Sequence, residues 1–393
     1  MTDVFLVGAA RTAVGSFGGA LKDQLPGELA GLPIKAALAR AGLDPAAVAN
    51  VVVGNVIHTE PRDAYVARIA AMEAGIPKEV PAMTVNRLCG SGLQAIISAA
   101  QSVLLGDGDI AIGGGTEVMS RAPYFAPAVR WGQKMGDTTI IDGLTGVLND
   151  PFHRYHMGVT AENVAAHYGI SREDQDALAA ESQRRAAQAI EAGYFAEQIV
   201  PVEVMVKRKP VAFEVDEFVR GATTAEDLAT LRPVFKKQDG TVTAGNASGI
   251  NDGAAAVVLA SEKAVRAHGL KPLARLVSYG HAGVDPALMG IGPVPATRAA
   301  LAKSGLRVED LDVIESNEAF AAQACAVARE LGFDPARVNP NGSGISLGHP
   351  VGATGAIITT KLVYELQRVG GRYGLTTMCI GGGQGIAAIW ERV

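Results

Sequence analysis

The thiol of Cys89 is the first side chain whose surroundings indicate chemistry. Cys89 precedes Gly90-Ser91-Gly92 and the nearly uncharged segment 93–105, a pattern that predicts a helix buried on all sides. A cysteine in the first turn of such a helix lies near unpaired N–H groups and the positive end of the helix dipole, so we expect a stabilised thiolate. Cys89 is therefore a candidate nucleophile. The alternative is a small buried residue at a tight turn, and the neighbouring glycines, which let a substrate approach the backbone, favour the nucleophile.

A histidine in a glycine-rich loop is the second candidate. Gly348-His349-Pro350 lies within residues 341–355, where Pro350 restricts the turn and a further apolar helix follows. A lone histidine is more often structural. Paired with a thiol from elsewhere in the chain, His349 becomes a candidate general base.

Two further cysteines and an asparagine need separate interpretations. Cys379 ends the apolar segment 375–379, two residues before the glycine triplet 381–383, and is a candidate reactive thiol or a buried strand residue. Cys325 lies in an Ala-rich segment, and we assign it to helix packing without chemistry. Asn317 follows a short apolar strand and precedes a helix, where it could cap the helix or orient a water in a cleft; capping is favoured by the sequence alone.

The chain repeats itself, and the repeat indicates which elements must position these residues. The matched landmarks, in the same order in both halves, are Ala36-Ala37-Leu38-Ala39 with Ala299-Ala300-Leu301-Ala302, Val85-Asn86 before Gly90-Ser91-Gly92 with Val338-Asn339 before Gly342-Ser343-Gly344, and Gly113-Gly114-Gly115 with Gly381-Gly382-Gly383. His349 has no counterpart in the first half, and Cys379 corresponds to Ala111. The reactive groups are therefore additions to the repeat.

Helical patterns alternate with apolar strands in each half, which predicts an α/β fold. Two such halves are expected to pack their helices together into a five-layered αβαβα body. The predicted units are an N-terminal half (1–118 and 249–271), an inserted loop domain (119–248) and a C-terminal half (272–393). The active site should lie between the halves, because Cys89 belongs to the first and His349 and Cys379 to the second.

The composition excludes several classes of protein. Of the 393 residues, 48% are hydrophobic and 19% charged, which favours a large compact core. A net charge of −5 gives no reason to expect nucleic acid or an anionic membrane as a partner. Met1-Thr2-Asp3 and the short apolar run after it lack the features of a signal peptide, so a cytoplasmic location is expected. Three scattered cysteines do not form a disulfide framework or a Cys₄ zinc site.

The inserted segment has its own pattern. Ser171-Arg172-Glu173-Asp174 resembles a capping sequence for a polar helix that ends near Ala192, and its polar surface suggests a lid over the main body. The cations near it are Lys207, Arg208, Lys209, Arg220, Arg232, Lys236 and Lys237. A solvated surface explains most of them; a phosphate-bearing ligand beneath the lid is the alternative.

Together these motifs resemble the thiolase family. The four motifs, in order along the whole chain, are Asn86-Arg87-Leu88-Cys89-Gly90-Ser91-Gly92, Asn317-Glu318-Ala319-Phe320, Gly348-His349-Pro350 and Cys379-Ile380-Gly381-Gly382-Gly383-Gln384-Gly385. The chain is most similar to the bacterial biosynthetic acetyl-CoA acetyltransferases, and especially to the broad-range β-ketothiolases that feed polyhydroxyalkanoate synthesis. Many thiolases carry Gly-Gly-Ala-Ile-Ala at positions 342–346, where this chain has Gly-Ser-Gly-Ile-Ser. That departure leaves the acyl-chain preference open.

The resemblance implies duplicated βαβαβαββ halves and a mechanism. Cys89 would attack an acyl-CoA thioester while His349 takes the thiol proton. Cys379 would then remove the α-proton of acetyl-CoA, and the carbanion would attack the acyl group on Cys89 to give a 3-ketoacyl-CoA. One oxyanion hole would consist of His349 with a water held by Asn317, and the other of the backbone N–H groups of Cys89 and Gly381.

The resemblance also implies binding partners. Coenzyme A thioesters would be the substrates, with no metal and no bound cofactor, and the chain would form a homotetramer from tight dimers. The residues expected near coenzyme A or the acyl channel are Leu148, His156, Met157, Arg220, Ser248, Met289 and Phe320. Met157 could also limit acyl length or serve only in packing.

Three alternatives remain. The nearest is a degradative 3-ketoacyl-CoA thiolase of fatty-acid β-oxidation with a longer chain range. A carrier-protein-dependent ketosynthase would use two histidines, or His and Asn, with its cysteine, and Cys379 argues against it. A non-catalytic acyl-CoA-binding module has no need for both thiols.

Overall fold

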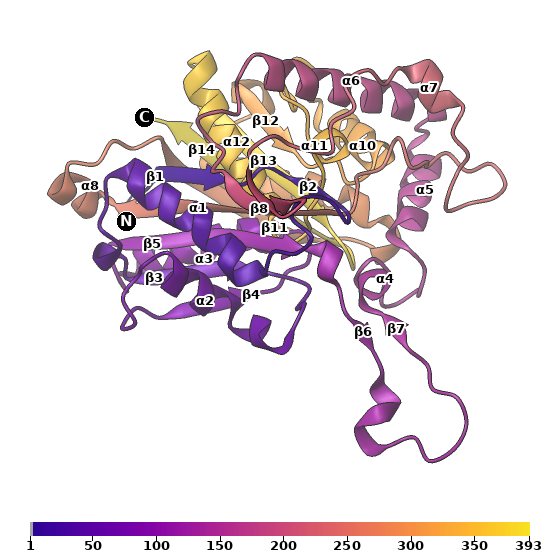
Figure 1. Cartoon of the computed structure of the whole chain (residues 1–393). Helices are drawn as coiled ribbons and strands as arrows, with labels where there is room; N and C mark the ends of the chain where they lie inside the picture. Colours follow the sequence, from indigo (N-terminus) through magenta and orange to yellow (C-terminus); the bar gives the residue numbers. More distant parts are fainter. Residues whose placement is uncertain (1–2) are drawn as a thin grey trace.

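The computed structural model describes residues 3–393, and within them the largest sheet has ten strands (Figure 1). Its strand order is β12-β13-β14-β11-β1-β10-β5-β3-β4, with β2 added to β10. The bounds are β1 Val4–Arg11, β2 Gly15–Ser16, β3 Asn50–Gly54, β4 Ala82–Val85, β5 Ile110–Val118, β10 Asn251–Ser261, β11 Ala274–Gly283, β12 Val313–Ser316, β13 Tyr373–Ile380 and β14 Gln384–Arg392. Met1 and Thr2 lie outside the described residues. The prediction that the chain lacks a signal peptide rests partly on these two residues.

The duplication seen in the sequence is present in the sheet. In the first half the order is β1-β10-β5-β3-β4, and in the second it is β11-β14-β13-β12, followed by a parallel bridge between Ile314 and Val338. The second strand of each order, β10 in the first half and β14 in the second, is antiparallel to both of its neighbours. The strands beyond it pair in parallel: β5 with β3 and β3 with β4 in the first half, and β13 with β12 in the second. The two halves meet where β1 and β11 pair at Phe5–Arg275 and Leu6–Ala274. The two β layers are thus joined along one edge.

Helices complete the five layers. Their bounds are α1 Pro26–Ala41, α2 Val66–Glu73, α3 Ser91–Leu105, α8 Glu262–His268, α9 Pro293–Ser304, α10 Ala321–Leu331, α11 Gly344–Leu347 and α12 Thr354–Val369. Short 3₁₀ turns are η1 Pro45–Ala47, η2 Pro61–Tyr65, η3 Met119–Arg121, η4 Pro127–Trp131, η5 Pro286–Ile291 and η6 Val308–Asp310. Helices α1 and α2 cover one β layer, α9 and α10 cover the other, and α3 and α12 pack together between them. The αβαβα architecture predicted from the sequence is confirmed.

Successive side chains of each strand point to opposite faces of the sheet and are apolar on both, which explains why helices cover both faces of each β layer. Val51 and Val53 of β3 face α1 and α2, whereas Val52 faces the central helices. In β14, Ala387 and Ile389 face the outer helices. Successive strand side chains point to opposite faces, so each apolar strand contributes to two clusters of the core.

The central helix α3 carries the candidate nucleophile at its start. The window Leu88–Leu105 is long and apolar enough to cross a membrane, but 61% of it is buried inside the protein. Gly92 in its first turn allows the close approach of α12, since a Cβ at this position would lie 2.8 Å from the backbone nitrogen of Ala356. Burial between two β layers therefore explains the apolar composition of this helix.

The inserted segment leaves the sheet after β5 and returns at β10. It contains β6 Tyr124–Phe125, β7 Ile141–Asp142, α4 Gly143–Val147, α5 Met157–Tyr168, α6 Arg172–Glu191, β8 Val202–Val206, β9 Lys209–Phe213 and α7 Ala225–Ala229. Residues 124–142, here called the projecting hairpin, extend away from the body (Figure 1).

The predicted helix after Ser171 is confirmed, with a capping box between Ser171 and Asp174. Its expected role as a lid stays a prediction. Helix α6 packs on α10 and α11 and contributes no residue to the wall of the catalytic cavity described below. Its buried face carries small and polar residues such as Ala179 and Ser182, which fit closely against α11.

Candidate active site

A cavity of about 450 Å³ lies where the two halves and the inserted segment meet. The predicted site residues that line it are Cys89, Leu148, His156, Met157, Ser248, Met289, Phe320, His349, Cys379 and Gly381. The other lining residues are Met119, Val234, Phe235, Thr243, Ala244, Ala247, Gly249, Ile250, Ala319 and Val351. Both thiols and the imidazole, which are far apart in the sequence, therefore face one mostly apolar cavity.

Cys89 sits on a tight turn between β4 and α3. Leu88, which precedes it, has a φ of 46°, a left-handed conformation that is costly for a branched side chain. The turn is held by side chains on both sides: Leu88 N–H donates to Asn86 Oδ1 at 2.9 Å, and Ser91 Oγ donates to Leu88 O at 2.7 Å. These bonds fix the thiol at the start of α3.

The protonation state of Cys89 differs from the sequence prediction. Helix α3 begins at Ser91 with Gly90 as its N-cap, so Cys89 lies just before the helix and outside its first turn. Burial raises the pKa of the Cys89 thiol, and hydrogen bonds from the backbone N–H groups of Gly381 and Cys89 oppose this shift without reversing it. The expected stabilised thiolate is therefore wrong for the free protein, and the thiol needs a base.

His349 lines the same cavity as Cys89 and is the candidate for that base. Its side chain is buried, and burial lowers the pKa of the imidazole to about 4, so the ring is neutral at pH 7. His349 Nδ1 lies 2.6 Å from Thr354 Oγ1, and Thr354 Oγ1 donates its single proton to Pro350 O at 2.9 Å. The hydroxyl oxygen must then accept from Nδ1–H. This leaves the lone pair on Nε2, the nitrogen that can accept a proton.

Asn317 lies beside that nitrogen. Its Nδ2 is 3.5 Å from His349 Nε2, and the residue is buried at the end of β12. The favoured interpretation as a helix cap is wrong, because the N-cap of α10 is Phe320 and no side chain caps it. Among residues 3–393, Oδ1 of Asn317 has no hydrogen-bond partner, which leaves a buried acceptor at the edge of the site.

Cys379 occupies the end of β13, before a turn that only glycines make easily. Gly382 and Gly383 have φ values of 80° and 86°. Cys379 is buried, and burial together with the negative charge that would develop on Cys89 raises the pKa of its thiol well above the usual range. The thiol is thus a weak acid whose thiolate, once formed, is a strong base.

The cavity walls are built from aromatic and thioether side chains. His156 stacks on Phe235 with ring centroids 4.6 Å apart, and Phe235 meets Phe320 edge to face at 6.3 Å. Met157 and Met289 belong to the same apolar cluster as Cys379. Such walls exclude water and suit an acyl chain or another narrow apolar group. Phe235 was missed in the sequence, where a lone aromatic in a loop gives no signal.

Two predicted site residues, Asn317 and Arg220, are not among the residues that line the cavity. Arg220 is exposed; its backbone N–H donates to Gln183 Oε1 at 2.7 Å, and its guanidinium lies 6.0 Å from the ring centre of Phe218. Cys325, to which no chemistry was assigned, donates to Asp174 O at 3.7 Å, and burial raises its pKa to about 12.

Glu117 and Asn251 support the site without having been predicted. The Glu117 carboxylate accepts from the backbone N–H groups of Val56, Ile57 and Gly352 and thereby ties the end of β5 to the loop after His349. Burial nevertheless raises the pKa of Glu117 to about 8. Asn251 Oδ1 accepts from His349 N at 2.9 Å. Both residues lie far from His349 in the sequence, so no local spacing could have identified them.

Comparison with known proteins identifies the family of the chain. The model for "Thiolase, N-terminal domain" matches residues 4–263, and that for "Thiolase, C-terminal domain" matches residues 270–392. The chain is 65% identical over 391 residues to beta-ketothiolase BktB of Cupriavidus necator, covering 100% of this chain and 99% of that protein. It is 52% identical to the acetyl-CoA acetyltransferase of Pseudomonas aeruginosa, with both chains fully covered.

Solved structures give the same result. Human mitochondrial 3-ketoacyl-CoA thiolase superposes with a TM-score of 0.97 at 48% identity, covering 100% of this chain and 99% of that one. The structure of the same human enzyme in complex with CoA has a TM-score of 0.96, covering 100% and 98%. Since both family models and these relatives span nearly the whole chain, this protein belongs to the thiolase family.

Proposed function

We propose that this acyltransferase is a β-ketothiolase that joins acetyl-CoA to a short acyl-CoA, giving a 3-ketoacyl-CoA and free CoA in a reversible reaction. The observation that carries the proposal is the convergence of Cys89, His349 and Cys379 on one apolar cavity. The 65% identity to a beta-ketothiolase over the whole chain supports the same reaction.

The first half of the reaction transfers an acyl group to Cys89. His349 Nε2 takes the proton of the Cys89 thiol, and the thiolate attacks the thioester carbon of the acyl-CoA. The carbon–sulfur bond to coenzyme A breaks. The departing CoA thiolate takes a proton from Cys379, so that CoA leaves as a thiol and Cys379 becomes a thiolate.

The second half forms the carbon–carbon bond. The Cys379 thiolate removes a proton from the α-carbon of acetyl-CoA, and the resulting carbanion attacks the acyl carbon held on Cys89. The bond from that carbon to Cys89 sulfur breaks, and Cys89 recovers its proton from His349. Both thiols and the imidazole return to their starting states, and the same steps in reverse give thiolysis.

Two sets of donors would stabilise the negative oxygens of these steps. The backbone N–H groups of Cys89 and Gly381 lie at the Cys89 sulfur, so they suit the carbonyl oxygen of a group bound to that sulfur. Asn317 and His349 then remain for the carbonyl of the second acyl-CoA. Once His349 Nε2 has taken the proton of Cys89 it carries an N–H that can donate, and the Asn317 amide nitrogen lies 3.5 Å from it.

Removal of each thiol separates the two half-reactions. We expect Cys89→Ala to lose acetyl transfer from labelled acetyl-CoA to the protein. We expect Cys379→Ala to keep single-turnover acylation of Cys89, with water supplying the leaving-group proton, while condensation falls by at least about a thousandfold. Labelled protein would be measured by mass spectrometry and condensation by release of free CoA. Equal losses of both half-reactions in Cys379→Ala would contradict its role as the base.

A degradative thiolase with a longer chain range is the second candidate. The 48% identity to human mitochondrial 3-ketoacyl-CoA thiolase and the apolar walls of the cavity favour it. Thiolysis of C4 and C10 3-ketoacyl-CoA substrates separates the candidates: a short-chain enzyme would have the higher kcat/KM on C4. Condensation of acetyl-CoA with propionyl-CoA, compared with acetyl-CoA alone, measures the range in the synthetic direction.

We also infer that the protein assembles into a homo-oligomer, a tetramer built from dimers. The support is the projecting hairpin, whose exposed large apolar residues are Tyr124, Phe125, Val129, Trp131, Met135, Ile140 and Ile141. An apolar group of this size on an extension from the body gains stability when a second copy covers it.

A further inference from the structure

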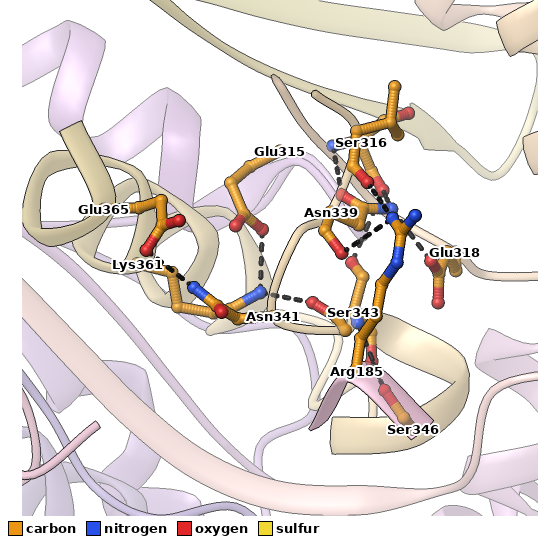
Figure 2. A network of polar contacts seen from close by, with 12 residues as sticks. Arg185, Glu315, Ser316, Glu318, Asn339, Asn341, Ser343, Ser346, Lys361 and Glu365 are labelled. Atoms are coloured by element: carbon orange, nitrogen blue, oxygen red, sulfur yellow. Dashed lines mark hydrogen bonds and ion pairs between the residues drawn. The ribbon is translucent and has the colours of Figure 1, made fainter. Parts of the chain in front are cut away.

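A polar network surrounds Glu315, Ser316 and Glu318, the residues on both sides of Asn317 (Figure 2). It joins helix α6 of the inserted segment to the end of β12, the loop before α11 and helix α12. Its members are Ser182, Arg185, Glu315, Ser316, Glu318, Asn339, Asn341, Ser343, Ser346, Lys361 and Glu365. The reaction proposed above uses none of them directly.

Hydroxyl groups within the network form a chain with one direction. Ser182 Oγ lies 2.6 Å from Glu318 Oε2 and 2.8 Å from Ser346 Oγ. Ser182 donates its single proton to Glu318, so its oxygen accepts from Ser346, whose proton is shared with Ser343 O at 3.2 Å. Ser346 Oγ in turn accepts from the backbone N–H of Ser343 at 3.2 Å. Each hydroxyl in this chain is therefore oriented by the hydrogen bond that its neighbour makes.

A second arm of the network holds the residues on both sides of Asn317. Asn339 Nδ2 donates to Glu318 Oε1 and to Ser316 O, both at 2.8 Å, and Asn339 Oδ1 accepts from Ser316 N at 2.9 Å. Asn339 itself has a φ of 45°, so the backbone is bent to make these contacts. The backbone of Asn317 is therefore clamped between Ser316 and Glu318.

Gly344 leaves room for the side chain of Asn317. A Cβ at position 344 would lie 2.8 Å from Asn317 Oδ1 and 2.7 Å from Glu318 O. The hydroxyl of Ser346 meanwhile contacts Ser182, which donates to Glu318.

We propose that Ser182 and Ser346 are positioning residues for the condensation step, acting through Glu318 to set the Asn317 amide relative to His349. This inference rests on the proposed function. Nδ2 of Asn317 is 3.5 Å from His349 Nε2, at the outer limit of a hydrogen bond, so a small displacement of residue 317 separates the pair. Misplacement of a catalytic group by about 1 Å costs up to about a hundredfold in rate.

The test compares Ser182→Ala and Ser346→Ala with Ser102→Ala. Ser102 is a matched control, because it is a buried helical serine whose hydroxyl donates to Ala99 O at 2.8 Å, far along α3. We expect each network variant to lower kcat for condensation about tenfold, with KM and the rate of Cys89 acylation within about twofold of wild type. Ser102→Ala should retain wild-type kinetics. Melting temperature is recorded for every variant.

The double variant Ser182→Ala/Ser346→Ala gives the sharpest readout. Because the hydroxyls form one chain, breaking it twice should cost no more than breaking it once, so the double variant should match the singles. Gly344→Ala tests the same position without removing a hydroxyl and should also lower kcat for condensation more than acylation.

The outcomes separate the two proposals. A wild-type protein that acylates Cys89 but never condenses would overturn the proposed function. Wild-type condensation with network variants as fast as Ser102→Ala would overturn the positioning role, as would equal loss of both half-reactions. If Ser346→Ala does not fold, Ser182→Ala on the facing helix tests the same chain.

Discussion

At the scale of single residues, the thiol of Cys89 carries a proton in the free protein because burial outweighs the hydrogen bonds to its sulfur. The rate of alkylation by iodoacetamide follows the thiolate fraction, which rises tenfold per pH unit below the pKa. We expect the alkylation rate at Cys89 to increase about tenfold per unit from pH 7 to pH 9, measured by mass spectrometry of the peptide. Acetyl-CoA should protect the residue. A rate that is already constant near pH 7 would show a stabilised thiolate and contradict this account.

The tautomer of His349 is a second property of a single residue, and one hydroxyl sets it. Thr354→Val keeps the shape of the side chain but removes the oxygen that accepts from Nδ1–H, so Nε2 no longer holds the lone pair in every molecule. Loss of such a supporting hydrogen bond typically costs about 10–100-fold in activity. We expect that loss in kcat for condensation and thiolysis.

Thr359→Val is the matched control, because Thr359 lies in the same helix and its hydroxyl donates to Gly355 O at 2.7 Å. It should keep kcat within about twofold. Equal effects in both variants would show that any buried hydroxyl of α12 matters and that the tautomer does not.

At the scale of elements, glycine sets the distance between α3 and α12. A methyl group at position 92 would lie 2.8 Å from Ala356 N and 3.0 Å from Gly352 O, and neither backbone atom can move without shifting a helix or the loop after His349. Forcing an extra methyl into a packed core costs about 1–3 kcal/mol. We expect Gly92→Ala to lower the melting temperature and also kcat, because both Cys89 and His349 lie next to this contact.

Gly146→Ala provides the control for this substitution, since a Cβ at position 146 of α4 meets nothing within 4 Å. Melting followed by circular dichroism compares the two. A Gly92→Ala protein as stable and as active as Gly146→Ala would show that the helices can separate at no cost.

The elements were predictable where a pattern repeats. The glycine triplets and the Val-Asn pairs recur in both halves, and matching strands of the sheet follow from them. Helix α6 was predicted from its capping sequence, but polarity alone did not predict the small polar face that packs on α10 and α11. From its neighbours alone Asn317 was interpreted as a helix cap, because the sequence does not give the direction of a side chain; only the resemblance placed it in the site.

At the scale of the whole molecule, the sequence predicted that the site joins two halves, but not the residues that hold it. Cys89, His349 and Cys379 are recognisable from their glycine-rich surroundings. Glu117 acts through a contact that only the packing of the halves creates, whereas Thr354 contacts His349 within the same loop and helix start, where the sequence does not show which way the two side chains point. Arg220 was assigned to coenzyme A by the resemblance; it is exposed outside the cavity wall, with its guanidinium 6.0 Å from the ring centre of Phe218, and its role in binding stays a prediction.

The projecting hairpin gives the last prediction, because its apolar surface has no cover within the described chain. Trp131 is 90% exposed and Met135 is 91% exposed, which favours burial against a second copy. We expect Trp131→Glu/Met135→Glu to reduce the molar mass in solution, measured by light scattering after gel filtration, toward a smaller assembly than wild type. Leu105→Glu, which replaces an 80% exposed leucine at the end of α3, should leave the mass unchanged. The hairpin lines no part of the catalytic cavity, so a dissociated variant that still acylates Cys89 would show that assembly and catalysis are separable. A variant with the same molar mass as wild type would show that the apolar hairpin does not hold the oligomer together.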